Sequence, residues 1–141
     1  MGTRSTIAFI DNREKDGKVV YSNELVRIYQ QYDGYPSGVG LKLANWLNDK
    51  KLVNGFSYDE TAENGYCNGV GCMSAQFIHD FKVGIGGLYI TDHDDFEEYN
   101  YKVIVTNDST ITLGAYEDGI CIFKGSVAEF IDAVYDGDFE D

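Results

Sequence analysis

The sequence predicts an α+β fold in which about three helices pack on a mainly antiparallel sheet. Three observations support this. Apolar and polar residues alternate near the N-terminus, four runs of strand-forming residues lie between positions 86 and 125, and helical periodicity recurs in three segments. With 141 residues, 43% of them hydrophobic, the chain is long enough for one core. We therefore expect a single domain over residues 1–135, followed by a short acidic tail over 136–141.

The N-terminal part of the chain predicts two or three strands. Residues 3–11 alternate in polarity, as expected for a strand with one apolar face. Asp16 and Gly17 form a dipeptide typical of hairpin turns. β-Branched and aromatic residues then recur at 19–22 and 25–31, and both segments favour strands.

Two helices are predicted in the middle of the chain. The first covers residues 38–52, and we expect Ser37, which follows Pro36, to cap its N-terminus. Its apolar stripe consists of Val39, Leu43, Trp46 and Leu47. A polar connection follows over 56–71, and a second, shorter helix is expected over 73–81.

The next region predicts a four-strand antiparallel meander. Its strand-length runs are residues 86–91, 99–106, 110–116 and 119–124. Asn107-Asp108 and Asp118-Gly119 separate the last three runs at hairpin spacing. Cys121 lies within the last run, where we expect a small core residue.

A third helix is predicted over residues 126–137. Ser126 and Glu129 have the spacing of a capping box, in which each side chain accepts a hydrogen bond from the other residue's backbone N–H. Gly137 stands where a helix commonly ends. We expect the three helices to cover one face of the sheet.

The net charge of −13 is unevenly distributed. Residues 1–90 hold ten acids and nine bases, whereas residues 91–141 hold fourteen acids and two bases. Direct nucleic-acid binding is not expected, because Lys and Arg make most phosphate contacts. The charge has two open interpretations, simple solubility or attraction to a basic partner. The residues of the candidate acidic face are Asp92, Asp94, Asp95, Glu97, Glu98, Glu117, Asp118, Asp132, Asp136 and Asp138.

Bulk composition also bounds the location of the protein. No apolar run approaches the roughly 20 residues that a membrane-spanning helix needs, so no membrane partner is expected. Three cysteines form an odd set, and no secretory-signal pattern precedes them. We therefore expect free thiols and a cytoplasmic protein.

Metal binding and catalysis find little support in the sequence. Cys67, Cys72 and His79 are too widely spaced for a typical zinc site. The acidic run at 92–98 lacks the glycine and the final glutamate of a calcium-binding EF-hand loop. Cys72 and His79 lie seven positions apart, too far for a hydrogen-bonded nucleophile and base on one helix. We expect no metal, no cofactor and no catalytic residue.

The glycine-rich stretch at residues 32–40 is the best candidate for a ligand site. It lies between a strand and a helix N-terminus, where backbone N–H groups favour an anion. The same glycines are equally compatible with turn geometry alone. The candidate ligand or structural residues are Arg4, Asp33, Tyr35, Gly38 and Gly40. Arg4 is expected to form an ion pair with Asp33.

Two stretches, Met1–Ile10 and Val26–Leu47, carry a family resemblance. Their motif residues are Thr3, Arg4, Ser5, Ile7, Tyr29, Asp33, Gly34, Tyr35 and Pro36. These motifs resemble those of small uncharacterised proteins found in bacteriophages and in bacteria that carry prophages. Gln31-Tyr32 replaces the His-Trp pair usual in that family. The resemblance implies a phage or prophage accessory protein, and it transfers no activity and no catalytic residue.

Two main functions follow as expectations. In the first, a non-enzymatic phage accessory protein uses its acidic face to bind and inhibit a basic, nucleic-acid-handling host protein in the host cytoplasm, as a DNA mimic does. In the second, a small molecule or nucleotide binds at the Asp33–Gly40 turn, and such a protein could be an enzyme. An oligomeric structural component is a third interpretation, and the sequence leaves open whether the chain is a monomer or a homodimer.

Overall fold

The computed structural model describes residues 2–92 and 97–139. Its helices are α1 (Leu41–Asn48), α2 (Gly69–Phe81) and α3 (Val127–Tyr135), with a π-helical turn at Pro36–Gly40 and a 3₁₀ turn at Ala62–Asn64. Its strands are β1 (Ser5–Lys15), β2 (Lys18–Gln30), β3 (Lys51–Val53), β4 (Tyr66–Asn68), β5 (Tyr89–Ile90), β6 (Tyr99–Thr106), β7 (Thr110–Glu117) and β8 (Ile120–Gly125). The α+β class predicted from the sequence is confirmed.

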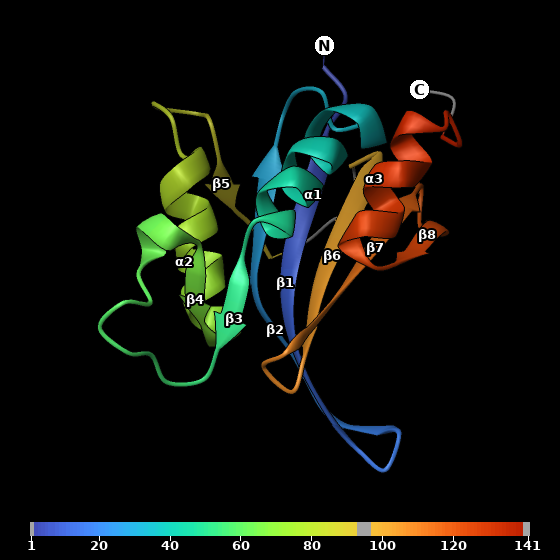
Figure 1. The fold of residues 1–141 in the computed structure, drawn as a ribbon. Coiled ribbons are helices and arrows are strands. Elements are labelled where there is room, and N and C mark those ends of the chain that lie inside the picture. The colour runs from blue at the N-terminus through green and yellow to red at the C-terminus, as the bar shows by residue number, and fades with distance from the viewer. Residues whose placement is uncertain (1, 93–96, 140–141) are drawn as a thin grey trace.

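Six strands form the main sheet in the order β5-β2-β1-β6-β7-β8. All neighbouring pairs are antiparallel except β1 and β6, which run parallel at the centre. The three helices lie on one face of this sheet (Figure 1). β3 and β4 form a separate two-stranded parallel sheet beside α2.

The predicted four-strand meander is wrong in one respect. Only Tyr89 and Ile90 of the first run form a strand, and they pair with β2 at the opposite edge of the sheet. The N–H of Thr91 also donates to the carbonyl oxygen of Arg27 at 2.9 Å, which ties this segment to β2. β6 then enters the sheet beside β1, so the meander contains β6, β7 and β8 only.

The first helix also differs from the prediction. It begins with the π-helical turn, whose N-cap is the extended residue Tyr35 and whose first residue is Pro36. Proline suits this position because the first helical N–H needs no partner within the helix. Ser37 therefore lies inside the turn and is not the cap. α1 ends at Asn48, and β3 begins three residues later.

Two further boundaries shift. α2 begins at Gly69, four residues earlier than predicted, and β4 and the 3₁₀ turn occupy part of the predicted polar connection. At the C-terminus, the ring of Phe139 lies 5.3 Å from that of Phe130. The packed part of the chain therefore extends past residue 135. The capping box of Ser126 and Glu129 at the start of α3 is confirmed.

The hydrophobic core lies between the sheet and the helices. Phe9 of β1 contacts Phe77 of α2 with ring centroids 5.5 Å apart. Tyr101 of β6 contacts Phe130 of α3 in an edge-on arrangement at 6.4 Å. These rings are almost fully buried, so α2 and α3 are held on the same sheet face by separate aromatic contacts.

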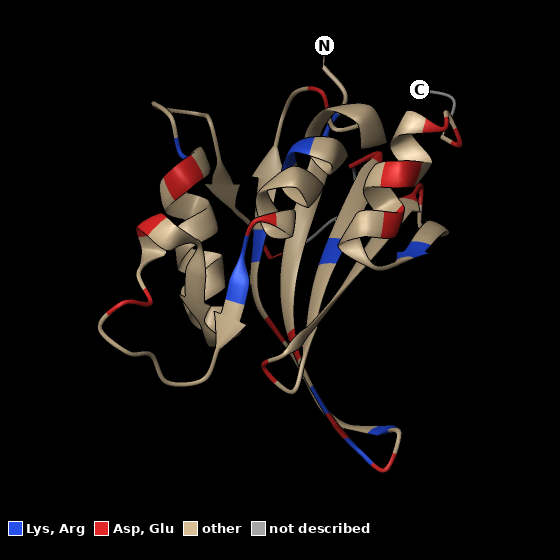
Figure 2. Ribbon diagram, viewed as in Figure 1, with Lys and Arg blue, Asp and Glu red and all other residues tan. Residues whose placement is uncertain are grey.

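The β1–β2 hairpin projects beyond the rest of the sheet (Figure 1). Its turn is formed by Asp16 and Gly17, with φ values of 55° and 78°, as the dipeptide predicted. Charged residues of both signs cluster at the tip of this hairpin (Figure 2). Among the described residues, no helix has the length and apolar character needed to cross a bilayer.

Candidate functional site

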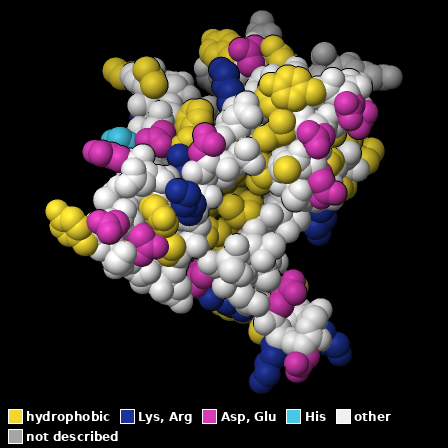
Figure 3. All heavy atoms as spheres, in the orientation of Figure 1, with side chains coloured by type: hydrophobic (Ala, Val, Ile, Leu, Met, Phe, Trp, Pro, Cys, Tyr) yellow, Lys and Arg dark blue, Asp and Glu magenta, His cyan; other side chains and the backbone are white. Residues whose placement is uncertain are grey.

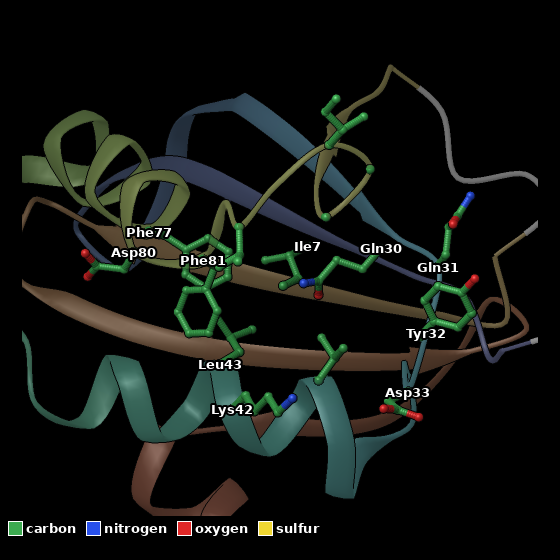
Figure 4. A pocket seen from close by; sticks show the side chains of 15 residues that line it. Ile7, Gln30, Gln31, Tyr32, Asp33, Lys42, Leu43, Phe77, Asp80 and Phe81 are labelled. Carbon is green, nitrogen blue, oxygen red and sulfur yellow. The ribbon is translucent and has the colours of Figure 1, made fainter.

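A cavity of about 610 Å³ opens between α1 and α2, above the ends of β1 and β2. Its volume falls within the range of small-molecule sites. Its wall residues are Ile7, Gln30, Gln31, Tyr32, Asp33, Val39, Lys42, Leu43, Phe77, Asp80, Phe81, Val83, Ile85, Gly86 and Gly87. Figure 4 shows that they come from both helices, the strand ends and the loop after α2. Hydrophobic side chains also gather in the depression between the α2 part of the molecule and the part with α1 and α3 (Figure 3).

One side of the cavity is apolar and aromatic. Phe77 and Phe81 are four positions apart on α2 and stack with ring centroids 4.4 Å apart, as the helical spacing allows. Trp46 of α1 meets Phe77 edge-on at 5.2 Å, which holds the wall from behind. Ile7 and Leu43 complete this side. The wall is therefore rigid and suits a flat, apolar ligand surface.

Gln30 provides the polar group on the cavity floor. The β1–β2 register pairs Ser5 with Gln30 and Ile7 with Ile28. Gln30 lies two positions after Ile28, so both side chains are on the sheet face that carries the helices. Its carboxamide ends beside Ile7 in the middle of the cavity (Figure 4). The Oε1 atom of Gln30 is buried and accepts no hydrogen bond from any described residue. A buried acceptor without a partner is uncommon and costs about 1–3 kcal/mol.

Charged groups lie at the α1 side of the cavity. Lys42 and Asp33 are both on this side (Figure 4). In the described part of the chain, Lys42 makes no ion pair. Asp33 accepts a hydrogen bond from the Tyr35 hydroxyl at 3.2 Å. A cation and a carboxylate are therefore both available to polar groups of a ligand.

Asp80 lies on the α2 side and is held as a carboxylate. The indole N–H of Trp46 donates to its Oδ2 at 2.8 Å, and Gln76 and His79 contact its Oδ1 at 3.0 Å. These hydrogen bonds lower the pKa of Asp80, with the Trp46 bond contributing most. Asp80 therefore remains ionised at neutral pH and fixes the position of Trp46.

Of the five candidate ligand residues, Asp33 alone lines this cavity. The backbone N–H of Gly38 donates to the Tyr35 carbonyl at 2.9 Å, and that of Val39 donates to the Asp33 carbonyl at 2.7 Å. The turn thus uses these N–H groups itself, and they are not free to hold an anion. A Cβ on Gly38 would lie 2.2 Å from the Asp33 carbonyl oxygen, so close packing requires glycine there.

The expected ion pair between Arg4 and Asp33 does not form. Neither residue has an ion pair in the described structure, and Asp33 is bonded to Tyr35 instead. Arg4 borders a different hollow, which it shares with Tyr29. The reason is that side chains alternate between the two faces of a strand. Arg4 lies two positions before Thr6, so it is expected on the same face. Thr6 pairs with Tyr29, and this face points away from the helices.

The structure brings some of the candidate acidic residues together. The N–H of Asp118 donates to the carbonyl oxygen of Glu98 at 2.9 Å, and Glu117 pairs with Tyr99 in the β6–β7 ladder. Glu97 precedes this group directly. Asp132, Asp136 and Asp138 are exposed on α3 and just after it. Acidic positions are coloured red along α3 in Figure 2, and acidic side chains are visible over this helix in Figure 3.

Other candidate acidic residues do not join this group. Asp92 follows β5 at the far edge of the sheet, and both β2 and β1 lie between β5 and β6. Asp94 and Asp95 lie outside the described residues. In the described chain, Glu97, Glu98, Glu117 and Asp118 therefore form one acidic group at the end of the β6–β7 ladder, and Asp132, Asp136 and Asp138 form a second group on α3 and just after it.

The cysteines show no sign of a metal centre. Cys67 is buried and Cys72 is exposed. Cys121 is exposed as well, although the sequence placed it in the core. It pairs with Tyr116 on the sheet face that carries no helix. Within the described ranges, no three His, Cys, Asp or Glu residues form a group that could hold a metal ion.

Several cavity residues were missed by the sequence prediction. Gln30 had a detectable signal, because it continues the inward-facing alternation of Val26 and Ile28 with a polar residue. Lys42 and the Phe77–Phe81 pair had none, since the cavity arises where α2 packs beside α1.

Comparison with protein-family models, with curated proteins and with solved structures finds no match. The fold and the cavity thus define the class of the protein. It is a small α+β domain with helices on one face of its sheet and a cavity between two of these helices.

Proposed function

We propose that this protein binds a small, flat molecule of the nucleoside class in the cavity between α1 and α2. The observation that carries the proposal is the carboxamide of Gln30, whose buried oxygen has no hydrogen-bond partner. A ligand N–H that donates to this oxygen would relieve its desolvation cost. The Phe77 and Phe81 rings provide an apolar wall for the flat part of the ligand.

The Gln30 carboxamide favours a heterocycle with a donor and an acceptor side by side. A glutamine amide presents one acceptor oxygen and a donor nitrogen in a plane. This pattern matches the amino and ring-nitrogen edge of adenine, which Gln and Asn recognise in other settings. Sugar hydroxyls would then find Asp33 and Lys42 at the α1 side of the cavity.

Charge favours a nucleoside over a triphosphate. The chain carries a net charge of −13, and the charged cavity residues are Asp33, Asp80 and one cation, Lys42. A polyanion would be repelled by the long-range field and meet only this one lysine. We therefore expect adenosine to bind more tightly than ATP.

Thermal unfolding and calorimetry with adenosine, cytidine and ATP test this proposal. Adenosine is expected to raise the melting temperature, because a ligand that binds only the native state stabilises it. Gln30→Leu should weaken adenosine binding about tenfold, the value of one good hydrogen bond. Asn45→Leu is the matched control, since Asn45 carries an exposed amide on α1 and does not line the cavity. Equal binding by Gln30→Leu and the wild type would refute the proposal.

The acidic face supports a second candidate function, binding to a basic partner. The supporting observation is the convergence of Glu98, Glu117 and Asp118 at one end of the β6–β7 ladder. The motifs of the chain resemble those of phage accessory proteins. On this proposal, the protein acts in the host cytoplasm, where it binds and inhibits a basic, nucleic-acid-handling protein. Such association should be fast and should weaken steeply with salt.

A charge-matched pair of variants tests this second function. Glu98→Gln/Glu117→Gln/Asp118→Asn neutralises the acidic face. Asp16→Asn/Asp59→Asn/Glu63→Gln removes the same number of charges elsewhere, at exposed positions. Capture of a basic host protein at low salt should be lost in the first variant and kept in the second. Equal capture by both variants would show that only net charge matters.

A further inference from the structure

We propose that Arg4 forms a binding site for a phosphate group on the sheet face away from the helices. Arg4 borders a hollow of about 330 Å³, together with Gly2, Tyr29, Gln31 and Tyr32. This site is separate from the nucleoside cavity and does not depend on it. The two hollows share only Gln31 and Tyr32 as wall residues.

Arg4 differs from the other two arginines in having no side-chain partner among the residues that the structure describes. Arg13 forms ion pairs with Asp11 at 3.1 Å and with Asp108 at 3.0 Å. Arg27 forms one with Glu24 at 2.7 Å. The guanidinium of Arg4 makes neither an ion pair nor a hydrogen bond within the described structure. A partly buried arginine is thus left unpaired within the described part of a chain with 24 acids and 11 bases.

The side chains around Arg4 are hydrogen-bond donors without partners. The hydroxyl groups of Tyr29 and Tyr32 and the carboxamide of Gln31 have no hydrogen bond in the described structure. The Tyr29 ring is braced by Tyr89, with ring centroids 5.9 Å apart. These donors therefore line the same hollow as Arg4, whose guanidinium is unpaired in the described structure.

This set of donors fits a phosphate better than a carboxylate. A guanidinium presents five N–H donors in a planar fork, and each tyrosine adds one O–H. A carboxylate has two oxygens that accept hydrogen bonds, whereas a phosphate monoester has three terminal oxygens. The phosphate can therefore accept hydrogen bonds from more of these donors. Arginine binds both groups through paired hydrogen bonds, so the additional tyrosine donors select the phosphate.

Backbone contacts hold Arg4 at this position. Its carbonyl oxygen accepts a hydrogen bond from the N–H of Tyr99 at 3.2 Å, which continues the β1–β6 ladder. The N–H of Gly34 donates to the carbonyl oxygen of the preceding residue, Thr3, at 2.9 Å. The backbone of Arg4 is thus held between two neighbouring segments.

Phosphate titration followed by NMR and by thermal unfolding tests the proposal. Phosphate and phenyl phosphate should shift the resonances of Tyr29, Gln31 and Tyr32 and raise the melting temperature. Acetate and chloride at equal ionic strength should not. Arg4→Gln should lose the phosphate response, and Arg13→Gln should keep it because Arg13 lies on the projecting hairpin. If Arg4→Gln does not fold, Arg4→Lys serves instead, since it keeps the charge but loses the paired donors.

A response to phosphate in Arg4→Gln equal to that of the wild type would overturn the proposal, as would equal responses to acetate and phosphate. Neither result bears on the nucleoside cavity, because no nucleoside is present in this experiment. Conversely, adenosine binding that fails while phosphate binding persists would leave the Arg4 site standing alone.

Discussion

Tyr101 donates its hydroxyl hydrogen to the carbonyl oxygen of Gly34 at 2.6 Å, across 67 positions of sequence. This buried hydrogen bond joins the first part of β6 to the turn that precedes the first helix. The Asp-Gly-Tyr-Pro segment is thereby fixed to the core. Asp33, which borders the nucleoside cavity, is held in place through the adjacent residue.

Tyr101→Phe should lower the free energy of unfolding by about 1–3 kcal/mol, because the buried carbonyl of Gly34 loses its side-chain donor. Urea denaturation monitored by circular dichroism measures this change. Tyr135→Phe is the matched control, since Tyr135 is 73% exposed. It should change the free energy by no more than about 0.5 kcal/mol. Equal effects of the two substitutions would show that the Tyr101 hydrogen bond adds no stability.

Gly40→Ala should destabilise the protein by about 1–3 kcal/mol through overpacking. A Cβ at this position would lie 3.0 Å from the rings of Phe130 and Tyr101. Gly71→Ala, on α2, would meet nothing within 4 Å. It should stabilise the helix by up to about 1 kcal/mol, the usual gain from glycine to alanine. Thermal unfolding of the two variants should therefore shift in opposite directions.

Features set by neighbouring residues could be predicted from the sequence. The turns at Asp16-Gly17, Asn107-Asp108 and Asp118-Gly119 all form, with positive φ at every one of these residues. The Ser126–Glu129 capping box also forms, as its spacing indicated. Each depends on a few adjacent residues, so no knowledge of the distant chain is required.

Features that depend on long-range packing could not be predicted. The pairing of β5 with β2 joins segments about 60 residues apart, and nothing in either segment specifies that edge. The packing role of the glycine-rich turn could not be predicted for a similar reason. Gly40 contacts Phe130 and Tyr101, which lie far along the chain, so its role is packing. The cavity itself forms where α1 and α2 meet, and only Gln30 gave a sign of it.

Cys67 should make the stability of the protein fall at alkaline pH. Burial raises the pKa of its thiol from 9.0 to about 11. Between these values the unfolded chain loses the thiol proton while the folded chain keeps it. The free energy of unfolding should therefore decrease by roughly 1 kcal/mol per pH unit in this range. Urea denaturation of the wild type and Cys67→Ala isolates this term from the tyrosines and lysines, and parallel pH profiles would contradict it.

Asp80 should contribute stability that disappears in acid. Its pKa is lowered, chiefly by the hydrogen bond from the Trp46 indole. The contribution is complete above the ordinary carboxyl pKa near 4 and is lost as the pH falls through the lowered value. Asp80→Asn should therefore be less stable than the wild type at neutral pH and equally stable in strong acid. Fluorescence of Trp46, the single tryptophan, reports the transition directly, and the exposed Asp59→Asn is the control. A stability difference that persisted undiminished at the lowest pH would show that the Asp80 contribution does not depend on its charge.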